Sequence, residues 1–358
     1  MLWLGLCSTG WLGSGPPSAK LLRSSVPRLL LSDVSEDAIN AALTPGERQV
    51  AAALKDRLAL SDAQTVKLLV KHPDVLGYGW QSNLAPTLDG IQAALSLSDD
   101  DLHKIIQKAP SALGLSLHKT LLPRIAALRE LFGLSTDQAR ELVLRFPRLL
   151  LFSMDDNVVP SAAALQSLLE LSVAELRTLV LKYPQVLSLS PSNNLAPTLR
   201  ALRSCLGVDD GDDQAAAAAE MRAIVLSMPS ILGLNVETNL RPKLAFLAEA
   251  MQCTPSELRS AVHRNPLVLG TSLEKSLRPN VNMWCQALPS DEEAPLRTLA
   301  EKGGLRVLTA SYEKRTKPRL ESALAAGVPV SRLLTKMRLT DTAFDAWLQK
   351  ESKRQHGE

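Results

Sequence analysis

Residues 254–279 read TPSELRSAVHRNPLVLGTSLEKSLRP, with prolines at positions 266 and 279 that stand 13 residues apart. The same spacing recurs in six proline pairs: Pro73 and Pro86, Pro110 and Pro123, Pro147 and Pro160, Pro184 and Pro197, Pro229 and Pro242, Pro266 and Pro279. Successive pairs lie 37 residues apart, except for one step of 45 residues between the fourth and fifth pairs. A repeat of this length is typical of a solenoid, in which each unit buries its apolar face against its neighbours.

The segment before each first proline predicts an α-helix. An N-cap residue stands twelve positions upstream in five of the six repeats, and a side chain able to complete a capping box, or a close variant of one, follows three positions later. These N-cap positions hold Ser61, Ser98, Ser135, Ser172 and Thr254, and Ala217 in the fifth repeat. Because proline lacks an N–H and disfavours α conformation in the preceding residue, we expect each helix to stop at the first proline.

A second helix is expected around each second proline. An apolar pair such as Val268 and Leu269 follows every first proline, and we expect a short 3₁₀ turn to bury it. Polar residues three positions before the second proline predict the N-caps of the second helices, which places the proline where its missing donor costs nothing. These residues are Asn83, Thr120, Asn157, Asn194, Asn239 and Ser276. Each repeat is therefore predicted as helix, proline turn, helix.

The array extends beyond the six clear copies. Residues 310–318 match 271–279 in spacing, and Leu305 stands where a first proline would be, which predicts a degenerate seventh repeat. A helix opened by a Thr44–Glu47 capping box precedes the array, and a closing helix is expected over residues 340–350. We predict a transit peptide at residues 1–35, a helical-repeat array at 36–348 and a polar tail at 349–358. Within the array the clear repeats span 61–300, the degenerate repeats span 301–348, and an acidic insertion lies at 207–214.

Composition excludes several classes of protein. The 358 residues are 46% hydrophobic but only 4% aromatic, and the five histidines are scattered. No phosphate loop, nucleophile elbow or metal-binding histidine pair is present, so we expect no enzyme, no cofactor and no metal site. The four cysteines, Cys7, Cys205, Cys253 and Cys285, lack paired spacing. Aspartates 209, 210, 212 and 213 lack the order of a calcium loop and predict a solvated loop. No apolar run reaches the roughly 20 residues that a membrane span needs.

The first 32 residues differ from the rest. They hold Lys20, Arg23 and Arg28, six serines and no acidic residue, a composition that favours an organellar transit peptide. A secretory signal is the alternative, because residues 2–6 are mostly apolar, but no basic residue precedes them. Mitochondrial and plastid import cannot be separated on this composition.

The Pro-x-x-Leu helix stop, the downstream second proline and the basic segment from Ser311 to Arg319 resemble the mitochondrial transcription termination factor (mTERF) family over residues 40–350. The resemblance implies an all-α, right-handed α-solenoid of seven to eight repeats that forms a curved superhelix in the mitochondrial matrix or chloroplast stroma. It also implies binding to duplex DNA or structured RNA in transcription termination or initiation, RNA maturation or ribosome assembly. The chain departs from the pattern in its acidic insertion and at Ser227, where neighbouring repeats carry a cation.

Two groups of basic residues are candidates for contacts to a phosphate backbone. The first stands two positions before the first prolines and comprises Lys71, Lys108, Arg145, Lys182 and Arg264. The second is a C-terminal cluster of Lys314, Arg315, Lys317, Arg319, Arg332, Lys336 and Arg338. For the first group the alternative is purely structural, because the helix macrodipole favours a cation in the last turn of any helix. A third set around the second prolines, Arg124, Arg200, Arg241, Lys243 and Arg278, is predicted to form a solvated face.

Net charge sets a condition on this hypothesis. Residues 33–300 carry 25 basic and 30 acidic side chains, so nucleic-acid binding requires that the cations gather on one side of the array. The alternative function is a monomeric protein-binding scaffold in an organellar ribonucleoprotein or ribosome-assembly complex, for which the acidic insertion would be a contact surface. The position of the cations in the fold discriminates between the two.

Overall fold

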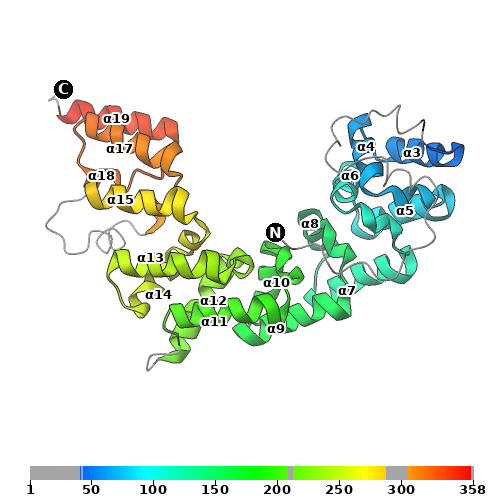
Figure 1. Ribbon diagram of the computed structural model, residues 1–358, viewed down its shortest axis with the longest axis horizontal. Coiled ribbons are helices and arrows are strands. Elements are labelled where there is room, and N and C mark those ends of the chain that lie inside the picture. The colour runs from blue at the N-terminus through cyan, green and yellow to red at the C-terminus, as the bar shows by residue number, and fades with distance from the viewer. Residues whose placement is uncertain (1–40, 42, 209–212, 288–304, 356–358) are drawn as a thin grey trace. The chain divides into compact units, whose positions relative to one another are not determined.

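The computed structural model describes residues 41, 43–208, 213–287 and 305–355, and every element in these ranges is a helix or a helical turn (Figure 1). The predicted all-α array of proline-punctuated repeats is confirmed. Of the helices described, none combines the length and the apolar character of a membrane span. The predicted transit peptide and residues 209–212, half of the acidic insertion, lie outside the described residues. The chain divides into two compact units, residues 1–160 (unit 1) and 161–358 (unit 2), which are described separately.

Unit 1 holds the first three repeats. Its elements are α3 (Pro45–Arg57), α4 (Asp62–Lys71), η1 (Pro73–Gly77), η2 (Trp80–Leu84), α5 (Ala85–Leu95), α6 (Asp99–Lys108), η3 (Pro110–Gly114), η4 (Leu117–Leu121), α7 (Leu122–Phe132), α8 (Thr136–Arg145), η5 (Pro147–Leu151) and η6 (Met154–Val158). Helix α9 (Val159–Leu169) begins at the end of unit 1 and lies mostly in unit 2.

Unit 2 holds the later repeats and the C-terminal helices. Its further elements are α10 (Val173–Lys182), η7 (Pro184–Ser188), η8 (Pro191–Leu195), α11 (Ala196–Cys205), α12 (Gln214–Ser227), η9 (Pro229–Gly233), η10 (Val236–Leu240), α13 (Arg241–Met251), α14 (Pro255–Arg264), η11 (Pro266–Gly270), η12 (Leu273–Leu277), α15 (Arg278–Ala287), η13 (Leu305–Thr309), η14 (Tyr312–Thr316), α17 (Lys317–Ala325), α18 (Val330–Leu333) and α19 (Asp341–Gln355). Turns η13 and η14 and helix α17 stand where the later part of the seventh repeat is predicted, and α19 stands where the closing helix is predicted; the first helix of that repeat would lie outside the described residues.

The first helix of each repeat begins and ends where the sequence predicts, with one exception. Ser61, Ser135, Ser172 and Thr254 form complete capping boxes, and Ser98 caps its helix without the second half of the box. In the fifth repeat the predicted start at Ala217 is wrong. Helix α12 begins a turn earlier, because the Asp213 carboxylate accepts the Ala216 N–H at 3.0 Å and Ala217 has no side-chain acceptor.

A 3₁₀ turn follows each first helix and contributes a buried apolar pair to the core of the array. The apolar pair after each first proline is at most 4% exposed in all six clear repeats, as Val75 and Leu76 illustrate. Turns η1, η3 and η5 contact one another in sequence in unit 1, and η7, η9, η11 and η13 do so in unit 2. The buried pairs therefore form a continuous apolar row within each unit.

The predicted N-caps three residues before the second prolines are wrong. The helical segment starts four residues earlier, as a π-helical turn. In this turn the carbonyl of the residue seven positions before the proline accepts a hydrogen bond from the N–H five residues further along the chain. In the first repeat, for example, the Leu84 N–H donates to the Gly79 carbonyl at 3.1 Å. Polar side chains cap this turn in most repeats, and Ser190, whose hydroxyl accepts the Asn193 N–H, is typical. The π-helical hydrogen bonds end at the second proline, because proline has no N–H to donate.

Polar side chains directly after the second prolines join successive repeats. Thr87, Ser161, Thr198, Lys243, Asn280 and Arg319 are buried at this position, and Arg124 is half-buried. Four of them donate to a carbonyl in or near the next 3₁₀ turn: Arg124 to Leu150 at 2.8 Å, Ser161 to Leu189 at 2.9 Å, Lys243 to Leu269 at 2.8 Å and Asn280 to Leu308 at 3.0 Å. Since a buried carbonyl without a donor is costly, these bonds help to hold each turn on its neighbour.

Replacing Asn280 with alanine is expected to destabilise the protein by about 2–4 kcal/mol, because its amide donates to both the Leu308 and Ala310 carbonyls, at 3.0 and 2.9 Å. Asn282 lies on the same helix and is exposed, so Asn282→Ala is the matched control. Urea unfolding followed by circular dichroism measures both variants. Equal unfolding free energies for the two would contradict the structural role of Asn280.

Candidate nucleic-acid interface

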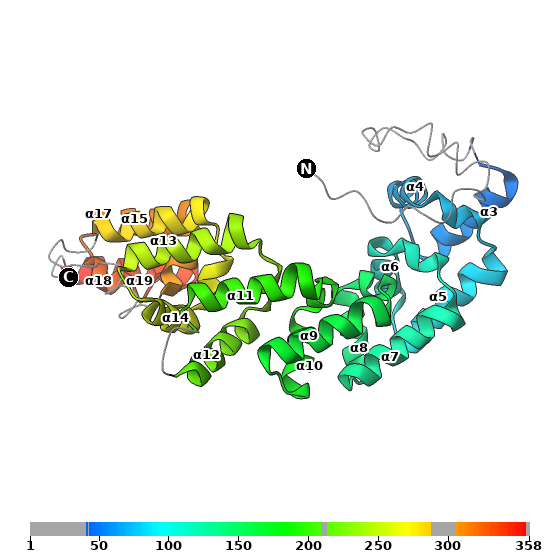
Figure 2. The same cartoon turned by 60° about the horizontal axis from the view of Figure 1, so that its bottom comes forward.

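Each repeat has two edges of different composition. The proline edge comprises the last turn of the first helix, the 3₁₀ and π turns, and the first turn of the second helix. The capping edge comprises the end of the second helix and the start of the next first helix. Because the turns of successive repeats contact one another within a unit, each unit has one continuous proline edge (Figures 1 and 2).

Charge is separated between these edges most strongly in unit 2. The described proline-edge segments, 181–200, 226–245, 263–282 and 305–321, hold 12 basic and 4 acidic side chains, and ten of the 12 basic ones are exposed, Lys243 and Arg319 being buried. The described capping-edge segments, 164–180, 201–208, 213–225 and 246–262, hold 4 basic and 6 acidic side chains. In unit 1 the proline edge, at 70–89, 107–126 and 144–160, holds 6 basic and 4 acidic side chains. The segregation that nucleic-acid binding requires is therefore present, chiefly in unit 2.

The first predicted group of cations lies on the proline edges. In unit 1, Lys71, Lys108 and Arg145 end their helices and are exposed, and Arg145 pairs with Glu141 at 3.8 Å. They occupy equivalent positions beside the contacting turns η1, η3 and η5, so they form one row.

In unit 2 the same row contains Lys182 and Arg264, with Ser227 between them. Lys182 Nζ donates to the Leu226 carbonyl at 2.9 Å and to the Ser227 carbonyl at 2.5 Å, so it reaches the equivalent position of the next repeat and caps the end of α12. Arg264 ends α14 and is exposed. One member of this group thus has a clear structural function, and Arg264 makes no such contact with a described residue.

The C-terminal cluster divides into exposed and engaged cations. Lys314 and Arg315 lie in the π turn η14, Lys317 is the first residue of α17, and all three are exposed. In the described ranges, no acidic group lies within ion-pair distance of these three. Lys336 and Arg338 follow α18 and are half-exposed and exposed, respectively.

The other two members of the cluster are engaged within the C-terminal helices. Arg319 is 5% exposed, and its guanidinium donates to the Met337 and Leu339 carbonyls at 3.0 and 2.9 Å and to the Asp341 carboxylate at 2.6 Å. It also packs 4.5 Å from the centre of the Phe344 ring. Arg332 pairs with Glu351 at 2.6 Å. Arg319 is therefore a structural residue and is not free to contact a ligand.

The five cations around the second prolines were predicted to be solvated. The prediction is wrong for Arg124 and Lys243. Arg124 and Lys243 point into the array and bond to carbonyls of the following repeat, and burial lowers the pKa of both groups. Arg200, Arg241 and Arg278 are exposed, as predicted.

A further group of basic side chains, one histidine and several arginines, was missed from the sequence and stabilises the capping edge. Each occupies the position five residues after the predicted start of a first helix. Each donates to a carbonyl at the end of α3, α5, α9 or α11, the helix that precedes the first helix of the previous repeat, where the macrodipole favours positive charge. Members with such contacts are His103 to Leu58, Arg140 to Ser96, Arg222 to Glu170, and Arg259 to Leu206 and Gly207. The signal for this group in the sequence is the recurrence of His or Arg at that one helix position.

The helix macrodipole helps to distinguish cations that stabilise a helix from cations that are candidates for ligand binding. It accounts for a cation at the end of a first helix, but it disfavours one at the start of a second helix. Arg241 and Arg278 stand at such starts and are offset by Glu237 and Glu274 one turn earlier, at 3.2 and 3.3 Å. Lys314, Arg315 and Lys317 stand at an equivalent start with no described acidic partner. Helix stability does not account for this concentration of positive charge.

The fold defines an α-helical repeat protein of the solenoid class, with a basic proline edge in its second unit. The family model described as mTERF matches residues 24–204 and 163–302. These overlapping regions span most of the chain, which therefore belongs to the mTERF family, a family of organellar helical-repeat proteins that bind nucleic acid and regulate gene expression. Among curated proteins, none matches the chain.

Arg259 and Arg264, five residues apart on α14, are expected to respond differently to substitution. Arg259→Met should destabilise the protein by about 2–3 kcal/mol, because it removes the ion pair with Glu220 at 2.7 Å and two carbonyl contacts. Arg264→Met should leave the unfolding midpoint unchanged and weaken nucleic-acid binding, with the slope of log K against log salt reduced by about 0.7–0.9. Thermal unfolding and a salt titration of binding measure the two effects. A destabilised Arg264→Met protein, or unaltered binding by it, would contradict this assignment.

Proposed function

We propose that the protein binds double-stranded DNA or structured RNA through the proline edge of unit 2 and thereby regulates gene expression in an organelle, in transcription termination or initiation or in RNA maturation. Contacts to the phosphate backbone supply the affinity, because the edge offers Lys and Arg side chains and few aromatic ones. The protein contributes no chemistry of its own. Family membership supports the nucleic-acid ligand, and it also supports import into mitochondria or chloroplasts.

One observation carries this proposal: Lys314, Arg315 and Lys317 are exposed together at the start of α17. Like charges at adjacent exposed positions repel one another, and at the amino end of a helix each is further disfavoured by the macrodipole. An anionic ligand relieves both effects. A nucleic-acid backbone presents phosphates at a spacing that several such cations can contact at once.

Replacing Lys314, Arg315 and Lys317 together with alanine is expected to weaken binding to organellar duplex DNA or structured RNA and to lower the salt slope by about 2–3, because up to three phosphate contacts are lost. The matched control replaces Lys350, Lys353 and Arg354, three exposed cations of α19 that lie outside the proline edge. Fluorescence anisotropy across a salt titration measures both variants.

Two outcomes would contradict the proposal. Equal losses for the two triple variants would show that net charge, not the proline edge, drives binding. Absence of binding by the unaltered chain to both ligands at low salt would favour the alternative, a protein-binding scaffold in an organellar ribonucleoprotein or ribosome-assembly complex. The capping edge of unit 1, at 58–69, 90–106 and 127–143, would then be its first candidate surface, with 7 acidic and 4 basic side chains.

A further inference from the structure

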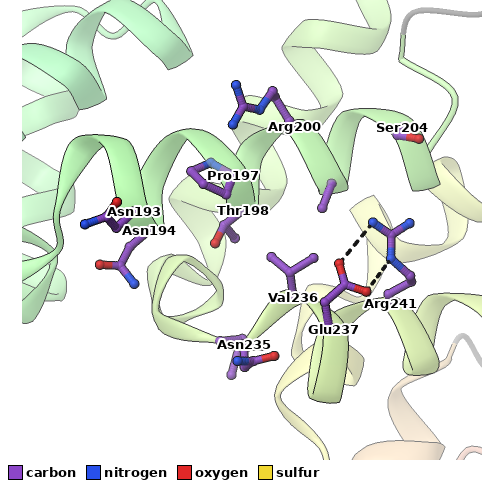
Figure 3. Close-up of a pocket in the computed structure, with 12 residues that line it drawn as sticks. Asn193, Asn194, Pro197, Thr198, Arg200, Ser204, Asn235, Val236, Glu237 and Arg241 are labelled. Carbon is purple, nitrogen blue, oxygen red and sulfur yellow. Dashed lines mark hydrogen bonds and ion pairs between the residues drawn. The ribbon is translucent and has the colours of Figure 1, made fainter. Parts of the chain in front are cut away.

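A groove of about 480 Å³ lies on the proline edge of unit 2, between η8 and α11 on one side and η10 and the start of α13 on the other (Figure 3). Asn193, Asn194 and Arg200 line the first side, and Asn235, Glu237 and Arg241 line the second. Pro197, Ala201, Leu234 and Val236 supply its apolar surface. None of the residues that line the groove is aromatic, so it offers no surface for stacking a base.

The amide side chains of this groove present mainly hydrogen-bond donors. The Asn194 carbonyl oxygen accepts the Ser190 N–H at 3.2 Å, and the Asn235 carbonyl oxygen accepts the Thr238 N–H at 2.8 Å. Their NH₂ groups are left for a ligand. The Asn193 side chain is exposed and has no hydrogen-bond partner among the described residues. A site lined by amide donors is complementary to a ligand rich in acceptor oxygens.

The groove also has one uncompensated positive charge. Glu237 is neutralised by Arg241, whose guanidinium donates to both carboxylate oxygens at 3.2 and 3.3 Å, and this hydrogen bonding raises the pKa of Arg241. Arg200 is exposed, extends away from that pair and has no acidic partner in the described ranges (Figure 3). Among the seven repeats, the position three residues after the second proline holds a cation only here.

We infer that this groove binds a short stretch of nucleic-acid backbone, with Arg200 pairing one phosphate and the Asn193, Asn194 and Asn235 amides donating to oxygens of the adjoining sugar and neighbouring phosphate. The inference rests on the proposed function and adds a fixed contact point to it. A guanidinium with neighbouring amide donors suits the several acceptor oxygens of a phosphodiester. The volume of the groove admits the sugar next to the phosphate. Such a contact fixes the register of the strand along the proline edge without reading a base.

The test uses the full chain and an oligonucleotide that it binds, in which single phosphates are replaced one at a time by neutral methylphosphonates. For the unaltered protein, at least one position is expected to lose about fivefold or more in affinity. Arg200→Ala should lose its sensitivity at one such position and keep it elsewhere, and Arg200→Lys should recover part of it. Lys275→Ala, which removes an exposed cation of the same edge, should retain the sensitivity at that position.

Asn193→Asp is a second variant, because a carboxylate at the same place repels the phosphate, and it should weaken binding with the same position-dependence. Both Asn193 and Arg200 are exposed, so unchanged thermal unfolding is expected for each variant. Identical methylphosphonate profiles for Arg200→Ala and the unaltered chain would overturn the inference and leave the proposed function intact. Failure of the unaltered chain to bind any duplex or structured RNA at low salt would overturn both.

Discussion

The hydrogen bonds around the 3₁₀ turns are the constraint on which the array depends. A first proline stops each first helix, and the five-residue turn that follows buries an apolar pair together with its backbone carbonyls. Carbonyls buried in this way need donors from outside the turn. In four repeats the residue after the second proline supplies one from the preceding repeat, as Lys243 does for Leu269. The prolines therefore determine where the turns form, and the residue that follows them determines how the turns are held together.

This requirement explains why the cations of the array cannot be treated as one group. Long cationic side chains are suited to reaching a neighbouring repeat, because their aliphatic stems pack against apolar surface while their heads donate to carbonyls. Arg124 and Lys243 do this along the row of turns, and Arg222 and Arg259 do it at the capping edge. The cations that remain exposed, without such carbonyl contacts, are the ones to consider for a ligand, and in unit 2 they concentrate on the proline edge.

Much of the fold is predictable from the sequence because its determinants are local. Capping boxes such as Ser172 with Glu175, and the stop at Pro184, depend only on neighbouring residues, and they were predicted correctly. The π turn was missed because asparagines such as Asn194 also have the chemistry of an N-cap, and only the bonding of Ser190 shows where the segment begins. The burial of Arg319 was not predictable, because its partners lie 18 to 22 residues further along the chain.

The candidate site was predictable only in part, for a related reason. A cation two residues before a proline has the same local sequence whether it binds a ligand or caps a neighbouring helix, and Lys182 and Arg264 illustrate the two cases. What distinguishes them is the contact each side chain makes: Lys182 donates to the Leu226 and Ser227 carbonyls at the end of α12, whereas Arg264 makes no such contact with a described residue. The two departures from the repeat pattern are therefore informative. Ser227 stands where Lys182 has a structural function, and Arg200 is an additional cation that the fold does not require.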